Sequence, residues 1–408
     1  LLAPPLGAQN ILAVDPGFRT GCKIVCLNRE GKLLEYATIN PHAGSDKART
    51  EAGETLLRLA KKHGAEVTAV GNGTAGRETE AFIRALPGWS IPVVMVSESG
   101  ASVYSASEAA RAEFPDLDLT YRGAVSIGRR LADPLAELVK IDPKSIGVGQ
   151  YQHDMPPKLL NEALSGVVED CVNAVGVDVN TASASLLGRV AGLNGTTAKN
   201  IVKYREENGA FTTRRQLLKV PKVGPKAFQQ CAGFLRVPES ASVLDNTGVH
   251  PESYAAAEAL LAQCGYTLSD VRAGAMGALK EKAEAMGLEA LARVCGVGVP
   301  TLADIIKELM KPGRDPRDEL PAPILRTDVM EARDLKPGME LQGTVRNVID
   351  FGAFVDIGVH QDGLVHISKL PQRVKHPSQL LSVGDVVTVW VLEVDEKKKR
   401  ISLTMKKP

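Results

Sequence analysis

Residues 186–239 contain one short pattern twice, and this internal repeat restricts the fold more than any other feature of the sequence. Residues 190–201 align with residues 220–231, which lie 30 positions later. In each copy an apolar residue leads into a glycine-containing turn and then into residues that suit a helix. Each copy therefore predicts a short helix, a tight hairpin and a second helix, so the centre of the chain should be all-α.

The positive charge of the chain is concentrated in the same segment. The 408 residues include 49 Lys and Arg against 48 Asp and Glu, a net charge of +1, which excludes a uniformly basic nucleic-acid binder. Residues 186–239 hold 10 basic and 3 acidic residues, which gives +7, whereas the flanking stretches 1–185 and 240–408 carry −4 and −2. A localised basic segment is typical of a module that contacts phosphates.

The two copies resemble the helix-hairpin-helix family, whose hairpin reads roughly apolar, Pro, Gly, apolar, Gly. Asn194 replaces the second glycine of the first copy, and we expect it to accept a positive φ; Lys222 replaces the first glycine of the second copy and adds a positive charge to that hairpin. Free N–H groups at the start of the following helix bind phosphate without reading bases. A purely structural two-helix hairpin is the alternative. The residues predicted to bind nucleic acid here are Gly192, Asn194, Gly195, Lys199, Lys222, Gly224 and Lys226.

The first 150 residues show a mixed α/β pattern. Three apolar strands are predicted over residues 11–17, 22–27 and 32–39, and a helix, a strand, a second helix and a last strand follow up to residue 96. The glycine-rich residues 71–76 lack the lysine of a nucleotide-binding loop, so we predict a plain turn from strand to helix there. This order of elements resembles the ribonuclease H-like fold, in its YqgF branch.

Three carboxylates of this first region are candidates for catalysis. Asp15 and Glu98 directly follow strands, and Asp133 lies in a predicted helical stretch over residues 126–140. Three acids around one cleft can hold two divalent ions and hydrolyse phosphodiesters. The YqgF branch is related to Holliday-junction resolvases, in which this helix usually carries two acids three residues apart. Here Ala136 stands three residues after Asp133, where the second acid would be. Pro134 suggests that Asp133 is instead the N-cap of a helix. We therefore predict a catalytically degenerate domain, and a metal-dependent, structure-selective nuclease is the alternative.

The last 70 residues alternate with period two, which indicates strands. Five short strands with glycines at their corners fit an OB-fold barrel, and they are predicted over residues 340–349, 352–357, 362–366, 386–394 and 400–405. The amino-acid sequence of this region resembles the S1-type RNA-binding domain. The resemblance implies that Phe351 and Phe354 stack on bases, that His366 adds a third flat surface, and that Asp395 and Arg400 form a polar pair beside them. We expect Lys397, Lys398 and Lys399 to be a solvated hairpin tip.

The fold class is therefore multidomain, α/β plus all-α plus all-β, and the chain starts with Leu1 rather than Met, as a fragment without its N-terminal region would. Residues 294–300 echo the hairpin pattern without basic neighbours, so we predict a packing turn there. The predicted domains are a ribonuclease H-like (YqgF) domain over residues 1–150, a tandem helix-hairpin-helix domain over 151–238, an Ala-rich helical domain with a Pro-rich linker over 239–322, and the OB-fold RNA-binding domain over 335–408.

The cysteines and the hydropathy of the chain indicate its cellular compartment. The six cysteines are scattered and form no CxxC pair, which disfavours a zinc site and favours a reduced, cytoplasmic protein with buried thiols. No run approaches the roughly 18 apolar residues of a membrane-spanning helix. We expect no membrane partner, no resident metal and no cofactor, apart from a divalent ion in the nuclease alternative.

The order of these modules resembles the Tex family of bacterial transcription accessory proteins, and so do the stretches 127–135, 149–154 and 244–253. The resemblance implies a nonenzymatic factor that binds RNA or DNA, or both, and a link to transcribing RNA polymerase. A factor in translation or RNA decay is a further alternative. The oligomeric state stays open.

Overall fold

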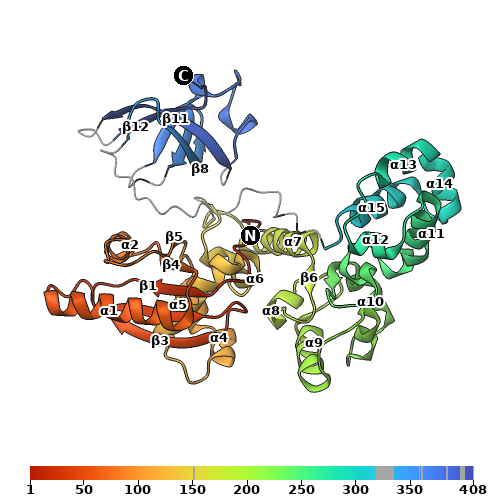
Figure 1. Cartoon of the computed structure of the whole chain (residues 1–408), viewed down its shortest axis with the longest axis horizontal. Helices are drawn as coiled ribbons and strands as arrows, with labels where there is room; N and C mark the ends of the chain where they lie inside the picture. Colours follow the sequence, from red (N-terminus) through yellow and green to blue (C-terminus); the bar gives the residue numbers. More distant parts are fainter. Residues whose placement is uncertain are drawn as a thin grey trace. The chain divides into compact units, whose positions relative to one another are not determined.

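The computed structural model describes most of the chain (Figure 1). It divides into two compact units, Leu1–Trp89 with Met95–Pro323 and Ser90–Val94 with Ile324–Pro408. Among the described helices, none has the length and apolar character needed to cross a bilayer. Lys397, Lys398 and Lys399 and most of the predicted linker fall outside the described residues, which are 1–149, 152–313, 315, 317, 335–357, 359, 362–382, 385–395 and 400–407.

The first part of the chain is built on a five-stranded sheet in the order β3-β2-β1-β4-β5. β1 pairs antiparallel with β2 and parallel with β4, and β2 pairs antiparallel with β3, so the first three predicted strands form a meander. Apolar residues fill β1, β2 and β4, and nearly all of these are buried. The strands are β1 (Ile11–Asp15), β2 (Cys22–Leu27), β3 (Leu33–Ile39), β4 (Val67–Gly71) and β5 (Val93–Val96).

Helix α5 (Leu119–Ala132) packs on β1, β2 and β4 and so covers the centre of the sheet. A Cβ at Gly128 would lie 2.8 Å from the Cβ of Ala13, so glycine permits this close approach. The predicted helix over residues 126–140 is interrupted, because α5 ends at Ala132 and a new helix begins at Pro134. The other helices here are α1 (Asp46–His63), α2 (Gly76–Arg84), α3 (Ala101–Ala106), α4 (Glu108–Glu113) and α6 (Pro134–Leu138).

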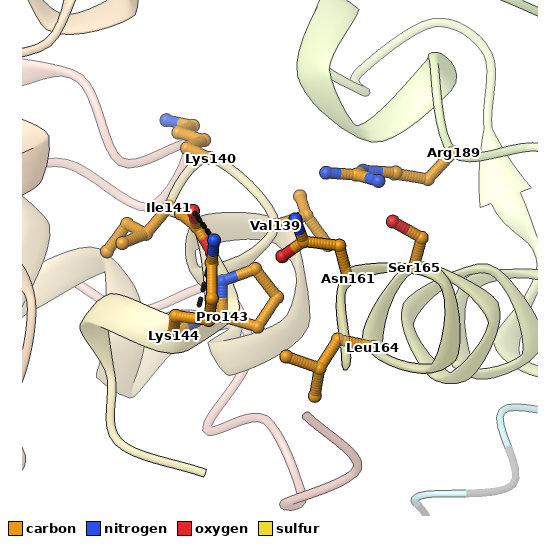
Figure 2. A pocket seen from close by; sticks show the side chains of 10 residues that line it. Val139, Lys140, Ile141, Pro143, Lys144, Asn161, Leu164, Ser165 and Arg189 are labelled. Carbon is orange, nitrogen blue, oxygen red and sulfur yellow. Dashed lines mark hydrogen bonds and ion pairs between the residues drawn. The ribbon is translucent and has the colours of Figure 1, made fainter. Parts of the chain in front are cut away.

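The basic segment folds into short helices around a core of its own, which also takes in Leu135 and Val139 of the α6 region. The long helix α7 supplies Val168, Val172 and Val175 to this core. A pocket lies beside α7 (Figure 2). The elements are α7 (Pro157–Val175), β6 (Val177–Asp178), α8 (Ala184–Leu187), α9 (Gly195–Asn208), a 3₁₀ helix (Arg214–Lys219), α10 (Pro225–Cys231) and β7 (Leu235–Arg236).

A second helical region follows with a separate core. Residues 268–286 of the predicted Ala-rich helical domain form two helices, because the chain turns at Gly274, whose φ is +69°. The helices are α11 (Tyr254–Cys264), α12 (Leu268–Arg272), α13 (Leu279–Met286), α14 (Leu288–Cys295) and α15 (Val299–Met310).

The C-terminal region is a closed five-stranded barrel in the order β10-β12-β11-β8-β9, as the period-two pattern predicts. Ala353, Val355, Val365, Ile401 and Leu403 are almost fully buried and fill its interior. The strands are β8 (Glu340–Ile349), β9 (Gly352–Asp356), β10 (Gly363–His366), β11 (Val386–Asp395) and β12 (Arg400–Thr404).

Candidate nucleic-acid interface

The outer surface of the barrel carries the predicted stacking residues. Ala353 and Val355 point inward, and strand residues alternate between the two faces, so Phe354 points outward. The register places Phe354 opposite Leu364 of β10. Phe351 lies in the turn before β9 and is 52% exposed. Neither phenylalanine belongs to the hydrophobic core of the barrel; the Phe351 side chain is exposed, and that of Phe354 is half-buried on the outer face.

Gly352 brings His366 close to these rings. The two residues are directly opposite each other in the β9–β10 register, and the N–H of Ile367 donates to the carbonyl of Phe351 at 2.8 Å. A Cβ at position 352 would lie 2.4 Å from the carbonyl oxygen of Val365, so only glycine allows β10 to approach this far. The Nδ1 of His366 accepts from the Ser368 N–H at 3.3 Å, which leaves the exposed Nε2 edge of the imidazole free to meet a base or phosphate.

The predicted polar pair lies on the same outer face. Asp395 and Arg400 are register partners at the ends of β11 and β12. Ser402 is the partner of Leu364, and Arg400 shares its face of β12 because it lies two residues away. Phe354, Leu364, Ser402 and Arg400 therefore share the outward side of neighbouring strands. The S1 resemblance implied a role for two of them, Phe354 and Arg400.

The hairpins of the repeat share one backbone geometry. Gly192 and Lys222 occupy equivalent positions and both have left-handed φ values, +82° and +69°. For a residue with a Cβ this conformation costs roughly 1–2 kcal/mol, so the surrounding structure holds Lys222 in place. Asn194 has φ −140°, and the prediction that it takes a positive φ is wrong. In the first hairpin the left-handed residue is Gly192, two positions before Asn194. The second hairpin forms although Lys222 stands at the equivalent position.

The two hairpins differ in how the following helix begins. The side chain of Asn194 accepts from the N–H groups of Thr196 and Thr197 and so caps α9. Gly224 occupies the equivalent position before α10 and has no side chain that could cap it. The second hairpin therefore leaves more N–H groups exposed toward an anion. All seven hairpin residues predicted to bind nucleic acid are exposed.

The two copies pack against each other. A Cβ at Gly192 would lie 2.5 Å from the Cβ of Gln230 on α10, and the side-chain amide of Asn200 on α9 donates to the carbonyl of Pro221 at 2.8 Å. Each hairpin thus rests on the second helix of the other copy. This mutual packing fixes the spacing between the two hairpins.

Two of the three candidate acids meet at one end of the sheet. Burial, then repulsion from Glu98, raises the pKa of the Asp15 carboxyl to about 6, against a weaker opposing effect of Lys23. Burial also raises the pKa of Glu98, although the Gly73 N–H donates to its carboxylate. A Cβ at Gly73 would lie 1.5 Å from Glu98 Oε1. The glycine-rich turn after β4 is therefore occupied by a carboxylate of the chain itself.

Asp133 does not join this pair. A Cβ at Gly123 of α5 would lie 2.8 Å from Asp15 Oδ2, whereas Asp133 follows ten residues later, about 15 Å further along the helix axis at 1.5 Å per residue. Asp133 accepts from the N–H of Ala136 and pairs with Arg317 at 2.7 Å, which confirms the N-cap alternative. Among the described residues, no group of three or more His, Cys, Asp or Glu side chains has an arrangement that could hold a metal ion.

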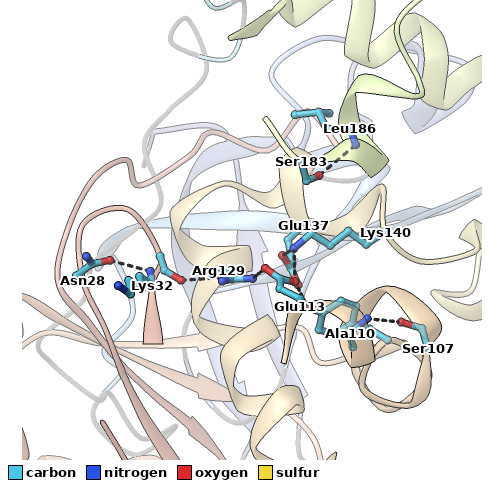
Figure 3. A network of polar contacts seen from close by, with 12 residues as sticks. Asn28, Lys32, Ser107, Ala110, Glu113, Arg129, Glu137, Lys140, Ser183 and Leu186 are labelled. Atoms are coloured by element: carbon cyan, nitrogen blue, oxygen red, sulfur yellow. Dashed lines mark hydrogen bonds and ion pairs between the residues drawn. The ribbon is translucent and has the colours of Figure 1, made fainter. Parts of the chain in front are cut away.

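A charged network fixes the corner between α5 and α6 instead (Figure 3). Arg129 pairs with Glu113 and donates to the carbonyl of Gly31 at 2.8 Å. Lys140 lies 2.8 Å from Glu137 and 3.4 Å from Glu113. Arg129, Glu137 and Lys140 therefore pair with other residues of this domain and have a structural role.

Family models match most of the chain. A model described as the YqgF-like domain of Tex proteins matches residues 9–132, and a helix-hairpin-helix motif matches residues 172–236. A further helix-hairpin-helix domain matches residues 242–317, and an S1 RNA-binding domain matches residues 334–406.

Curated relatives align along the whole chain. The "Transcriptional accessory protein Tex" of Neisseria gonorrhoeae is 52% identical over 411 residues, which are 100% of this chain and 53% of that protein. The Bacillus subtilis protein YdcI is 56% identical, over 100% of this chain and 57% of its own length. The human "S1 RNA-binding domain-containing protein 1" is 38% identical, over 99% of this chain and 46% of its own length.

The chain belongs to the Tex family.

It spans about half the length of the Tex relatives that it matches. Among solved structures, the solution structure of GSP13 from Bacillus subtilis is 43% identical, over 17% of this chain and 55% of that one, with a TM-score of 0.17. The multidomain fold class predicted from the sequence, with YqgF-like, helix-hairpin-helix and OB-fold parts, is confirmed.

A third hairpin of this Tex chain was not recognised from the sequence. Gly296 has φ +70° and Gly298 is the N-cap of α15, so residues 296–298 repeat the order of a left-handed residue, an apolar residue and an N-cap. The same order runs over 192–194 and 222–224. The echo of the pattern was visible, but the neutral surroundings led to the prediction of a packing turn.

Arg214 is the second feature that sequence reasoning missed. It is 1% exposed, and its guanidinium donates to Tyr254 Oη and to the carbonyls of three residues, Leu235, Thr247 and Val249. Its own N–H donates to Asp245 at 3.1 Å. The distinctive stretch 244–253 supplies most of these partners, and it joins the second hairpin to the helical region that follows.

The pKa of Asp15 predicts a pH-dependent stability. An acid whose pKa is about 6 in the folded chain and 3.8 in its ordinary state binds its proton more tightly when folded. The free energy of unfolding therefore falls as the pH rises from about 4 to about 6, and it stays lower above that range. We expect Asp15→Asn to raise it by about 2–3 kcal/mol at pH 7.5 and hardly at pH 4.

Urea unfolding at the two pH values measures this difference, with the exposed Asp116→Asn as the control. A gain for Asp15→Asn that is equal at both pH values would contradict the assignment.

Proposed function

We propose that this chain acts as a nonenzymatic transcription accessory factor that binds nucleic acid without strong sequence specificity. The observation that carries the proposal is the outward surface of the barrel, where Phe351, Phe354 and His366 surround Gly352. Aromatic faces stack on unpaired bases of any sequence. Titration of single-stranded RNA and DNA of several sequences against duplexes tests it, and comparable affinity for different single strands is the expected result.

The hairpins supply the second part of the proposed function. Lys199, Lys222 and Lys226 are exposed around the two hairpins, and the uncapped start of α10 adds N–H groups. Contacts of this kind go to the phosphate backbone and carry no sequence information. We propose that the barrel holds a single strand while the hairpins hold backbone phosphates, in RNA, DNA or both.

The hairpin contacts predict a change in salt dependence. Replacing Lys199, Lys222 and Lys226 with glutamine should reduce the slope of log affinity against log salt by up to about 2–3, because each lost phosphate contact accounts for about 0.7–0.9. Fluorescence titrations of a labelled strand at four or five salt concentrations measure the slope.

A matched control removes three cations elsewhere. Lys47, Lys61 and Lys62 of α1 are exposed, so their replacement with glutamine changes the net charge equally. The hairpin assignment fails if both triple variants have the wild-type slope.

The nuclease alternative rests on Asp15 and Glu98. Burial raises the pKa of both carboxyls, and the charge of Glu98 raises that of Asp15 further, so a nearby cation would favour their charged forms. The helix that would supply a further acid presents Gly123 and Ile127 to this end of the sheet. We therefore propose that the YqgF-like domain serves as a scaffold and does not cleave nucleic acid.

The Tex name of the relatives supports a role in transcription, and a contact with RNA polymerase stays a prediction. The domain boundaries at residues 150, 238 and 322, the boundary at residue 335 and a cytoplasmic location are also predictions.

A further inference from the structure

The pocket beside the first hairpin has no role in the function proposed above. Its volume is about 360 Å³, within the range of small-ligand sites. One wall is the segment after α6, and the other consists of α7 and Arg189. The two walls share one hydrophobic core, in which Leu135 and Val139 pack with residues of α7. The pocket is therefore a fixed part of this unit.

Arg189 is the side chain that gives the pocket its chemistry. It directly precedes Val190, where the first hairpin begins, and it is half-buried. The structure gives its guanidinium no hydrogen bond and no ion pair with any described residue. Figure 2 shows the guanidinium beside the hydroxyl of Ser165 and the amide of Asn161. A half-buried cation without a partner is costly, and its planar fork fits two oxygens of a phosphate.

The opposite wall supplies a second cation and a carboxylate. Lys144 Nζ lies 3.5 Å from Asp142 Oδ2, and the side chain of Lys144 is 37% exposed. Lys140 lies 2.8 Å from Glu137 and is 8% exposed, so its charge is already compensated. Arg189 and Lys144 carry two positive charges and Asp142 carries one negative charge, so the pocket has a formal excess of one positive charge. One negative charge, as on a phosphodiester, matches this balance better than the two charges of a phosphate monoester.

We infer that this pocket binds one phosphodiester group of a nucleic-acid strand that also contacts the first hairpin. Arg189 and the hydroxyl of Ser165 hold the phosphate oxygens, and Lys144 compensates charge from the other wall. The inference rests on the proposed function and deepens it, because it extends the path of the strand from the hairpin to the segment after α6.

The test compares Arg189→Gln with Arg111→Gln in titrations of a labelled strand over a salt series. Arg111 is exposed on α4 and lines no part of the pocket, so its variant matches the loss of charge. We expect Arg189→Gln to lower the slope of log affinity against log salt by about 0.7–0.9 and Arg111→Gln to leave it unchanged. Lys144→Gln should lower affinity severalfold. The unfolding temperature of Arg189→Gln should be at least that of wild type, because the half-buried charge that it removes has no partner among the described residues.

Other outcomes separate the two proposals. A wild-type chain that binds no nucleic acid contradicts the proposed function itself. Normal binding with equal slopes for Arg189→Gln and Arg111→Gln overturns only the pocket assignment. Inorganic phosphate, added over a range of concentrations, is the second probe, and the unfolding temperature is measured. If phosphate raises the unfolding temperature of wild type but not of Arg189→Gln, and the salt slopes of nucleic-acid binding are equal, then the pocket binds free anions. The inference about a strand would then be wrong.

Discussion

Replacing both Phe351 and Phe354 with alanine should weaken the binding of single-stranded RNA or DNA by at least about tenfold. Each base stacked on an aromatic ring contributes roughly 1–3 kcal/mol, and a factor of ten corresponds to about 1.4 kcal/mol. Phe351 is 52% exposed and Phe354 points away from the barrel interior, so the variant removes surface rings and leaves the core intact. Fluorescence anisotropy at one fixed salt concentration measures the loss.

Phe18→Ala is the matched control, because Phe18 is 49% exposed but lies in the loop after β1. This variant should bind single strands as wild type does. Phe351→Tyr keeps a stacking face and should retain most of the affinity. Wild-type affinity of the double alanine variant, with an unchanged unfolding temperature, would rule out the barrel surface as the stacking site.

We expect Arg214→Met to lower the free energy of unfolding of the helical region by about 3 kcal/mol or more. The substitution leaves the carbonyls of Leu235, Thr247 and Val249 without the donor that they share. It also removes a cation next to Asp245, and loss of one partner from a buried charged network typically costs 3–5 kcal/mol. For a cooperative unit of 150–250 residues this corresponds to a fall in unfolding temperature of roughly 6–12 °C.

The adjacent Arg215 provides the control, since it is exposed and Arg215→Met should change stability by less than about 0.5 kcal/mol. Hydrogen exchange of residues 235–254 locates the effect, which we expect in the segment that accepts from Arg214. Equal unfolding temperatures for Arg214→Met and Arg215→Met would show that the buried network does not hold the two helical regions together.

Periodicity predicted the parts of this fold that depend on local pattern. The strands of the first sheet, the paired hairpins and the five barrel strands follow from apolar spacing and glycine positions, whereas the arrangement of the first sheet was implied by the ribonuclease H-like resemblance. The outward position of Phe354 follows in the same way, because it alternates with the buried Ala353 and Val355.

The features that the sequence left undecided depend on contacts between distant segments. Asp133 is compatible with a catalytic carboxylate and with an N-cap, and its partner Arg317 lies 184 residues away. Arg214 donates mainly to backbone carbonyls. Every residue has such a carbonyl, so the acceptors cannot be identified from the residue types in the sequence. Lys222 stands where the hairpin pattern has a glycine, but its residue type does not predict a left-handed φ, because lysine rarely adopts one.

The carboxylate that fills the glycine-rich turn has a consequence for how a nucleic acid approaches the chain. Glu98 fills the space beside Gly71 and Gly73, so this turn has no room for a phosphate group. Residues 186–239 carry an excess of seven positive charges, and such a localised charge attracts a polyanion during diffusion, before any contact forms. We therefore expect association at low salt to begin at the hairpins and not at the glycine-rich turn.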